Sequence, residues 1–291
     1  PAENASDGNN TTLCVEQNGE RHERTFSDRQ LTANKSIVVS SPADSPEAWP
    51  ERENDNTTIV YTTTDGNILS FNPKDGAFGD GVKVIRHIRT GDNEFTIECD
   101  GAITRIPERQ FENKNTLQSI ILPESVTTIG DHAFRDCINL TGSLTIPRSV
   151  TTIGVCAFLN CKSLKGSLTI PGSVTTIGRS AFGSCSGFNG SLTIQDGVNT
   201  IREQAFGGCS SFTGPLTISK SVTTIGSEAF SKCMNMGDIY CKATVPPIIR
   251  KGAFPDPSQR VLRVPRNCAE TYRTAPGWSN LIFKEIVETE F

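Results

Sequence analysis

The sequence predicts a right-handed α/β repeat solenoid with a parallel β-sheet on one face, short helical turns on the other and a β-rich N-terminal cap. Two observations carry this prediction. The first is a period of 24 residues that separates consecutive Ala-Phe pairs, which begin at Ala133, Ala157, Ala181, Ala205, Ala229 and Ala253. The second is that the same apolar residues return at fixed positions around each pair. A unit this short buries its apolar face only by stacking on its neighbours.

The strand part of the repeat is seen most clearly in residues 143–166, which read Ser-Leu-Thr-Ile-Pro-x-Ser-Val-Thr-Thr-Ile-Gly-x-x-Ala-Phe-x-x-Cys-x-x-Leu-x-Gly. Polar and apolar residues alternate over 143–146, which indicates a strand. Pro147 ends that strand because proline has no N–H to donate to a neighbour. Val150 and Ile153 fit a second short extended or turn segment that directs both side chains inward.

The second half of the repeat predicts a corner followed by a turn. Gly154 permits unusual backbone angles at the corner. Phe158 and Cys161 stand three residues apart, a spacing compatible with one helical turn on the side opposite the sheet. Leu, Ile, Val, Ala, Phe and Cys recur in every copy and are expected in the core, whereas the variable positions are expected to face solvent.

This pattern resembles the BspA-like leucine-rich-repeat surface proteins, over residues 105–262. The resemblance implies a leucine-rich-repeat solenoid in a secreted or surface-anchored protein, often a lipoprotein, that binds or adheres to host or environmental ligands. It extends into a preceding segment that includes 61–68 and a closing segment around 264–278. The chain is accordingly divided into a polar leader or tether over 1–57, a β-rich N-terminal cap over 58–104, the solenoid over 105–262 and a C-terminal cap over 263–291.

Composition excludes several classes of protein. The 28 Lys and Arg nearly balance the 32 Asp and Glu, so the net charge is −4 and a nucleic-acid partner is not expected. No apolar run approaches the ~18 residues that span a bilayer, so no integral membrane span is expected. The sequence begins at Pro1 without an initiator Met, and we expect a mature extracellular or surface-anchored chain from which a targeting segment has been removed.

Ten cysteines raise the question of metal sites and disulfides. Five occupy one repeat position and are expected as a reduced, buried column, because free Cys packs as a small hydrophobe; they are Cys137, Cys161, Cys185, Cys209 and Cys233. One Cys per 24 residues gives no close ligand pair, so no metal site is expected. Cys156 stands at a solvent-type position. The sequence leaves open two disulfides, Cys14 with Cys99 and Cys241 with Cys268.

The search for an active site finds no nucleophile elbow, zinc-protease, Walker or dinucleotide-binding motif, and neither an enzyme nor a cofactor is expected. The outward strand positions remain as the candidate ligand surface. They are small hydroxyl residues in two columns, Ser143, Ser167 and Ser191, and Thr145, Thr169, Thr193 and Thr217.

The function expected from these features is that of a non-catalytic secreted or cell-surface binding or adhesion module. We expect a monomer that presents its repeat surface to a host or environmental protein or glycan. The alternative is a structural spacer or assembly subunit that displays another domain. A remote alternative is ice binding by the regular Thr array.

Overall fold

The computed structural model describes residues 5–6, 10–17, 20–27, 56–70 and 76–291, with side chains from residue 56 onward. The chain divides into two compact units, Pro1–Asp55 and Asn56–Phe291. In the first unit the described residues form an antiparallel sheet in the order β1-β2-β3. Its strands are β1 (Ala5–Ser6), β2 (Asn10–Gln17) and β3 (Glu20–Ser27). Most of the expected tether, residues 28–55, lies outside the described residues.

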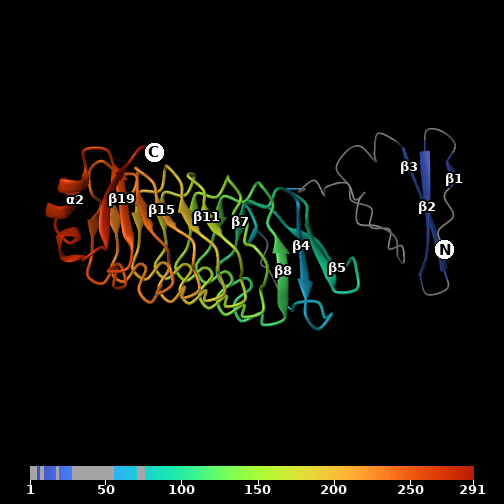
Figure 1. Cartoon of the computed structure of the whole chain (residues 1–291). Helices are drawn as coiled ribbons and strands as arrows, with labels where there is room; N and C mark the ends of the chain where they lie inside the picture. The colour runs from blue at the N-terminus through green and yellow to red at the C-terminus, as the bar shows by residue number, and fades with distance from the viewer. Residues whose placement is uncertain (1–4, 7–9, 18–19, 28–55, 71–75) are drawn as a thin grey trace. The chain divides into compact units, whose positions relative to one another are not determined.

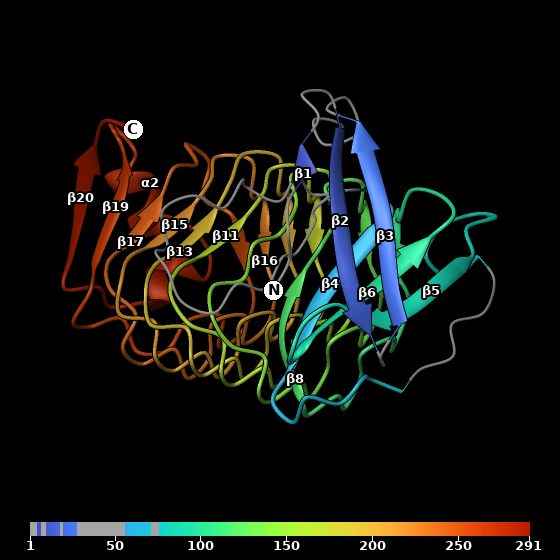
Figure 2. The ribbon, with the colours of Figure 1, turned by 90° about the vertical axis from the view of Figure 1, so that its right-hand side faces the viewer.

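The second unit begins with a four-stranded antiparallel sheet (Figure 1). Its order is β5-β6-β4-β8, made of β5 (Val84–Arg89), β6 (Glu94–Cys99), β4 (Thr58–Thr63) and β8 (Leu117–Ile121). The alternation in β4 turns Ile59 and Tyr61 into the core, where the ring of Phe95 stacks on Tyr61 at 5.3 Å between centroids. This is the β-rich element expected near 58–104, joined by a strand from the start of the repeats. Figure 2 shows it at one end of the solenoid.

The repeats build two parallel sheets, so the expectation of a single sheet is wrong. The first sheet has seven strands, and most carry the Thr-Ile of the Val-Thr-Thr-Ile segment. They are β7 (Arg105–Ile106), β9 (Thr128–Ile129), β10 (Thr152–Ile153), β12 (Thr176–Ile177), β14 (Thr200–Ile201), β16 (Thr224–Ile225) and β18 (Ile248–Ile249). Each Ile pairs with the Ile one repeat away, as Ile153 does with Ile177. The segment assigned from sequence to a short extended piece or a turn is therefore a sheet of its own.

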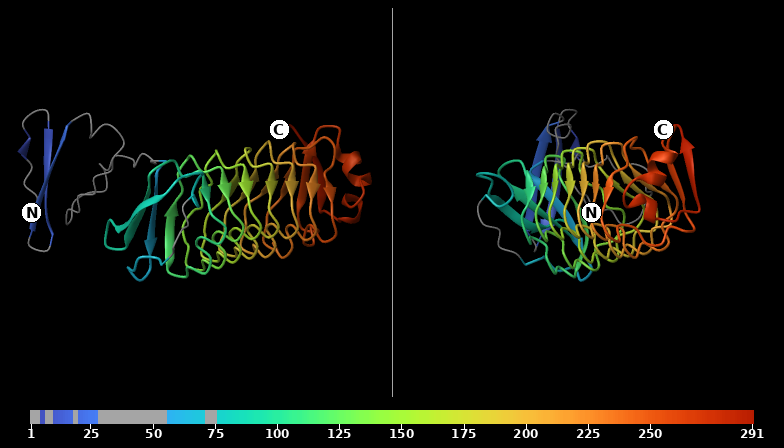
Figure 3. Two further views of the ribbon diagram at one scale, coloured as in Figure 1. Left: turned by 180° about the vertical axis from the view of Figure 1, so that it is seen from behind. Right: turned by 90° about the vertical axis from the view of Figure 1, so that its left-hand side faces the viewer.

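The second parallel sheet has six strands and begins with the Leu-Thr-Ile segments. They are β11 (Leu168–Ile170), β13 (Leu192–Ile194), β15 (Leu216–Ile218), β17 (Ile239–Cys241), β19 (Val261–Pro265) and β20 (Glu285–Thr289). Equivalent residues lie directly beside one another, as Leu168 does beside Leu192. Figure 3 shows the successive strands and the stacked turns of the coils. The parallel solenoid is thus confirmed, with two sheets in place of one.

The Ala-Phe-x-x-Cys segment forms consecutive β-turns instead of the expected helical turn. Two residues in each coil have positive φ, for example Ser180 at 51° and Ser184 at 56°, which interrupts any helix. Backbone N–H groups in this segment donate alternately within the coil and to the next coil. The Cys185 N–H donates to the Phe182 carbonyl of its own coil at 3.2 Å, and the Phe182 N–H donates to the Ala205 carbonyl of the next coil at 2.8 Å. The turns are therefore hydrogen-bonded to their neighbours as a strand would be, which satisfies the backbone without a helix.

The corner glycine also differs from its expected role. Gly154 and Gly178 are not among the residues with positive φ. A Cβ on Gly178 would instead lie 2.4 Å from the carbonyl oxygen of Gly154. Glycine at this corner thus allows two coils to approach closely, and a left-handed backbone is not required there.

Two columns of side chains fill the centre of the solenoid. The first contains Phe rings stacked at 5.0–5.5 Å between centroids and within 12° of parallel, from Phe111 through Phe134, Phe158, Phe182, Phe206 and Phe230 to Phe254. All are fully buried except Phe254, which is 7% exposed. The second column contains the five repeat cysteines, each fully buried. The expected burial and stacking of the Phe residues is confirmed.

The C-terminal end closes the last coil with aromatic residues. It consists of strand β19, helix α2 (Ala269–Thr274) and the short 3-10 helix η1 (Trp278–Asn280). Trp278 is 2% exposed and contacts the Phe254 ring at 5.6 Å and the Tyr272 ring at 5.1 Å. It therefore continues the Phe column into the terminal segment, as expected from the sequence.

Candidate functional site

The outer face of the six-stranded sheet carries the Thr column expected from the sequence. Leu and Ile in each Leu-Thr-Ile strand point inward, so the intervening Thr points outward. Thr169, Thr193 and Thr217 lie beside one another on β11, β13 and β15. Neighbouring strands are ~4.8 Å apart, so the three hydroxyl groups span about 10 Å.

The other predicted surface residues are only partly brought together. The Ser191 hydroxyl donates to the Ser167 hydroxyl at 3.2 Å, and the Ser191 N–H donates to the same oxygen at 3.0 Å. Ser143 and Thr145 are exposed but lie before β11, outside the strands. The Thr column thus starts one coil later than expected, because the equivalent earlier strand, β8, pairs with β4 in the antiparallel sheet.

The Thr column continues into residues that sequence reasoning missed. Tyr240 on β17 lies beside Thr217, and Arg263 on β19 lies beside Tyr240. The Arg263 guanidinium carbon lies 5.4 Å from the centre of the Tyr240 ring, and its Nη2 is 3.6 Å from Oδ2 of Asp238. The ring of Phe291 meets that of Tyr240 edge-on at 6.4 Å. We call Tyr240, Arg263 and Phe291 the aromatic-arginine cluster.

A signal for this cluster was present in the sequence. The step from Thr217 to its partner Tyr240 is 23 residues, as is the step from Tyr240 to Arg263. A strict period of 24 would therefore assign Cys241, not Tyr240, as the residue equivalent to Thr217. An alignment that allowed a one-residue deletion in each of these two coils would have placed both residues at the end of the Thr column.

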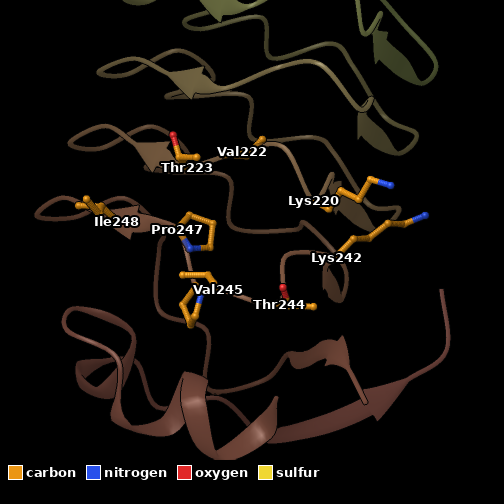
Figure 4. Close-up of a pocket in the computed structure, with 9 residues that line it drawn as sticks. Lys220, Val222, Thr223, Lys242, Thr244, Val245, Pro247 and Ile248 are labelled. Atoms are coloured by element: carbon orange, nitrogen blue, oxygen red, sulfur yellow. The ribbon is translucent and has the colours of Figure 1, made fainter. Parts of the chain in front are cut away.

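A hollow of about 480 Å³ lies between the two sheets, near the C-terminal end. Two lysines and an apolar surface line it, with two Thr hydroxyl groups; the lining residues are Lys220, Val222, Thr223, Lys242, Thr244, Val245, Pro246, Pro247 and Ile248. Figure 4 shows Lys220 and Lys242 extending from neighbouring coils in the same direction, with Val245 and Pro247 at the other side of the hollow. The hollow therefore combines positive charge with an apolar wall.

The repeat cysteines form a hydrogen-bonded column of thiols. Each Sγ donates to the carbonyl of a Phe on the preceding coil at 2.9–3.2 Å, as Cys185 does to Phe158 at 3.0 Å. Burial raises the pKa of Cys185 well above its usual value, and that of Cys137 to about 12. All five are free thiols. Since the thiolate is the reactive form, these groups are chemically inert in the fold.

The other cysteines give no disulfide and no metal centre in the part of the chain that the structure describes. Cys241 and Cys268 are both free and buried, so the pairing left open by the sequence is not formed. The Sγ of Cys241 instead lies 3.1 Å from the Tyr272 hydroxyl oxygen. Cys99 is a free buried thiol, and its suggested partner Cys14 lies where side chains are not described. Among the described residues no group of three or more His, Cys, Asp or Glu could hold a metal ion.

No helix within the described ranges has both the length and the apolar character needed to cross a bilayer.

Comparison with known proteins identifies the repeat. The family model for the BspA type leucine rich repeat region matches in six copies, over residues 104–236 and 166–275, which together make up more than half of the chain. The crystal structure of a leucine rich cell surface protein from Faecalibacterium prausnitzii A2-165 is similar, with 24% identity and a TM-score of 0.42. That match covers 78% of this chain but only 66% of the other, just under two thirds of its length. No curated protein matches. The chain belongs to the BspA-type leucine-rich repeat family.

Proposed function

We propose that the chain is a non-catalytic binding module of the cell surface that recognises a protein ligand with the outer face of its six-stranded sheet. The aromatic-arginine cluster carries this proposal. Tyr and Arg are enriched among the residues that dominate binding energy at interfaces, whereas small hydroxyl residues contribute little. The cluster would act as the anchor, and Thr169, Thr193 and Thr217 would form the flat surface beside it.

The packing of the cluster favours a protein over a glycan. Arg263 lies over the Tyr240 ring and Phe291 meets its edge, so the Tyr240 ring is partly covered where a sugar would stack. Tyr240 and Arg263 remain partly exposed and could still contact a polypeptide. The Arg263 Nη2 lies at 3.6 Å from Asp238, longer than a good hydrogen bond, which leaves donors of this guanidinium for a ligand carbonyl or carboxylate.

An extracellular or surface-anchored location and a monomeric state complete the proposal. The family supports the location. The spacer alternative predicts no ligand at all, so the same binding experiment tests it.

The experiment is a protein and glycan array probed with the whole chain, followed by titration of each ligand found. We expect Tyr240→Ala with Arg263→Ala to weaken binding at least about 30-fold, the loss that a 2 kcal/mol anchor implies. The matched control is Thr169→Ala with Thr193→Ala, on the same face, with an expected loss below about fivefold. Equal binding by the first variant and the parent would contradict the proposal, as would an array without ligands.

A further inference from the structure

The coil that lines the hollow departs from the repeat pattern at several positions. Ser149, Ser173 and Ser221 each donate their hydroxyl to a Val carbonyl of the preceding coil at 2.6–2.8 Å. One period after Ser221 stands Val245, which has no hydroxyl group. The carbonyl of Val222 therefore lacks the serine donor that Val126, Val150 and Val198 have, as does that of Val174, where Gly197 stands at the serine position.

Two prolines open the same coil further. Equivalent residues of earlier coils donate an N–H to the coil before them, as Thr223 does to Asn199 at 2.9 Å. Thr224 lies beside Ile248, so Pro247 lies at the position of Thr223 and has no N–H to donate. The segment Lys242–Pro247 is thus released from part of the bonding that closes the other coils.

Two side-chain hydrogen bonds nevertheless fix the backbone that forms the apolar wall of the hollow. The Trp278 indole N–H donates to the Pro247 carbonyl at 2.7 Å, and the Tyr272 hydroxyl donates to the Ala243 carbonyl at 2.8 Å. Val245 is 78% exposed and Ile248 60% exposed on this fixed backbone. Apolar side chains that are exposed and already ordered lose little conformational freedom when they bind, which favours affinity.

The charge of the hollow defines its ligand. No carboxylate lies within ion-pairing distance of Lys242 among the residues with described side chains, and its Nζ lies over the Phe291 ring at 5.4 Å. Lys220 is 3.8 Å from Asp196, but both side chains are largely exposed, at 74% and 57%, so this pair is weak. Two ammonium groups thus stand beside an apolar wall with little internal compensation.

We propose that this hollow binds an acidic peptide segment of a partner protein, in which a carboxylate side chain lies next to an aliphatic one. The carboxylate would pair with Lys220 and Lys242. The aliphatic side chain would pack on Val245 and Ile248. None of the lining residues belongs to the aromatic-arginine cluster, but Lys242 contacts the Phe291 ring of that cluster.

The test uses the whole chain and a fluorescein-labelled peptide in which Glu and Leu alternate, with binding followed by fluorescence anisotropy. We expect Lys220→Gln with Lys242→Gln to weaken binding by about tenfold or more, a change of about 1.4 kcal/mol. Val245→Asn, at an exposed position, should weaken it by a similar factor. Replacing Glu by Gln in the peptide should have the same effect as replacing the lysines. Raising NaCl from about 0.1 M to about 1 M should also weaken it, because the Debye length falls from ~10 to ~3 Å.

The matched control is Lys162→Gln with Lys165→Gln, which removes two exposed lysines outside the hollow and should leave binding within about twofold of the parent. A circular dichroism melt of each variant confirms that the fold is intact. Undiminished binding by the Lys220 and Lys242 variant would overturn the proposal, as would a Kd weaker than about 1 mM for the parent. Vesicles of phosphatidylcholine and phosphatidylserine serve as a second probe, and capture by vesicles without binding of the peptide would also overturn it.

Discussion

Truncation of Phe182 to Ala should destabilise the solenoid severely, because this ring is in the middle of the Phe column. Phe182 is fully buried and lies between Phe158 and Phe206, each at 5.3 Å and within 4° of parallel. Loss of a core Phe typically costs about 3–5 kcal/mol. Two aromatic contacts are removed here, each worth about 0.5–1.5 kcal/mol beyond burial. We therefore expect a loss in the upper half of that range, about 4–5 kcal/mol.

The assay is equilibrium unfolding in urea followed by circular dichroism, with native-state hydrogen exchange to locate the damage. Exchange should quicken most at amides bonded between adjacent coils, such as that of Phe158, which donates to Ala181 at 2.7 Å. Phe182→Leu retains much of the apolar volume but no ring contacts, so its expected loss is about 1–3 kcal/mol. A loss below about 1 kcal/mol for Phe182→Ala, or exchange that quickens equally in all coils, would refute the account of a stacked core coupled between neighbours.

Three further predictions concern thiols, pH and the C-terminal end. In native alkylation followed by mass spectrometry, Cys156 should label before the five repeat cysteines, since it is partly exposed while they are fully buried. Early labelling of Cys185 would contradict the packing. Burial lowers the pKa of His87, whose Nε2 lies 2.6 Å from the Tyr61 hydroxyl oxygen. The unfolded chain therefore takes up a proton at this site more readily than the folded chain does. The free energy of unfolding should be at its full value above about pH 6.5 and should fall as the pH drops towards the pKa of the folded state. Urea midpoints across this range should show the loss, and His87→Gln, which retains an acceptor but does not titrate, should remove the dependence. Deletion of residues 265–291 should cause aggregation visible by size-exclusion chromatography, because it uncovers the end of the Phe column and a sheet edge, and a monodisperse product would contradict this capping role.

The period, the core columns and the strand positions could be predicted because repetition within one chain separates buried from exposed residues. The turns could not, since the i, i+3 spacing of Phe182 and Cys185 fits a helical turn and a β-turn equally. The difference depends on left-handed residues such as Glu228 and Lys232, whose side chains give no hint of positive φ. The seven-stranded sheet was missed for a related reason, because its strands are only two residues long and alternation is not visible in them.

The candidate site was harder to predict than the fold. Thr169, Thr193 and Thr217 were identified as outward residues because their strands obey the 24-residue period. Tyr240 and Arg263 were missed because each follows its neighbour by 23 residues. The hollow depends on a valine in place of a serine and on two prolines, and the effect of such exceptions is visible only when the neighbouring coil is known.

Equivalent bonds between coils recur one period apart, because the Phe158 N–H donates to Ala181 and the Phe182 N–H donates to Ala205. One repeat of 24 residues corresponds to a coding segment of ~72 nucleotides, and this segment is therefore a natural unit of duplication and loss. Repeating residues 167–190 would insert a coil that satisfies both of its neighbours and would carry the aromatic-arginine cluster ~4.8 Å further from the N-terminal sheet. An insertion of half a coil, by contrast, would place different residues at the core positions and interrupt both core columns. The length of the proposed binding face can consequently change in steps of one whole coil during evolution, while the core stays the same.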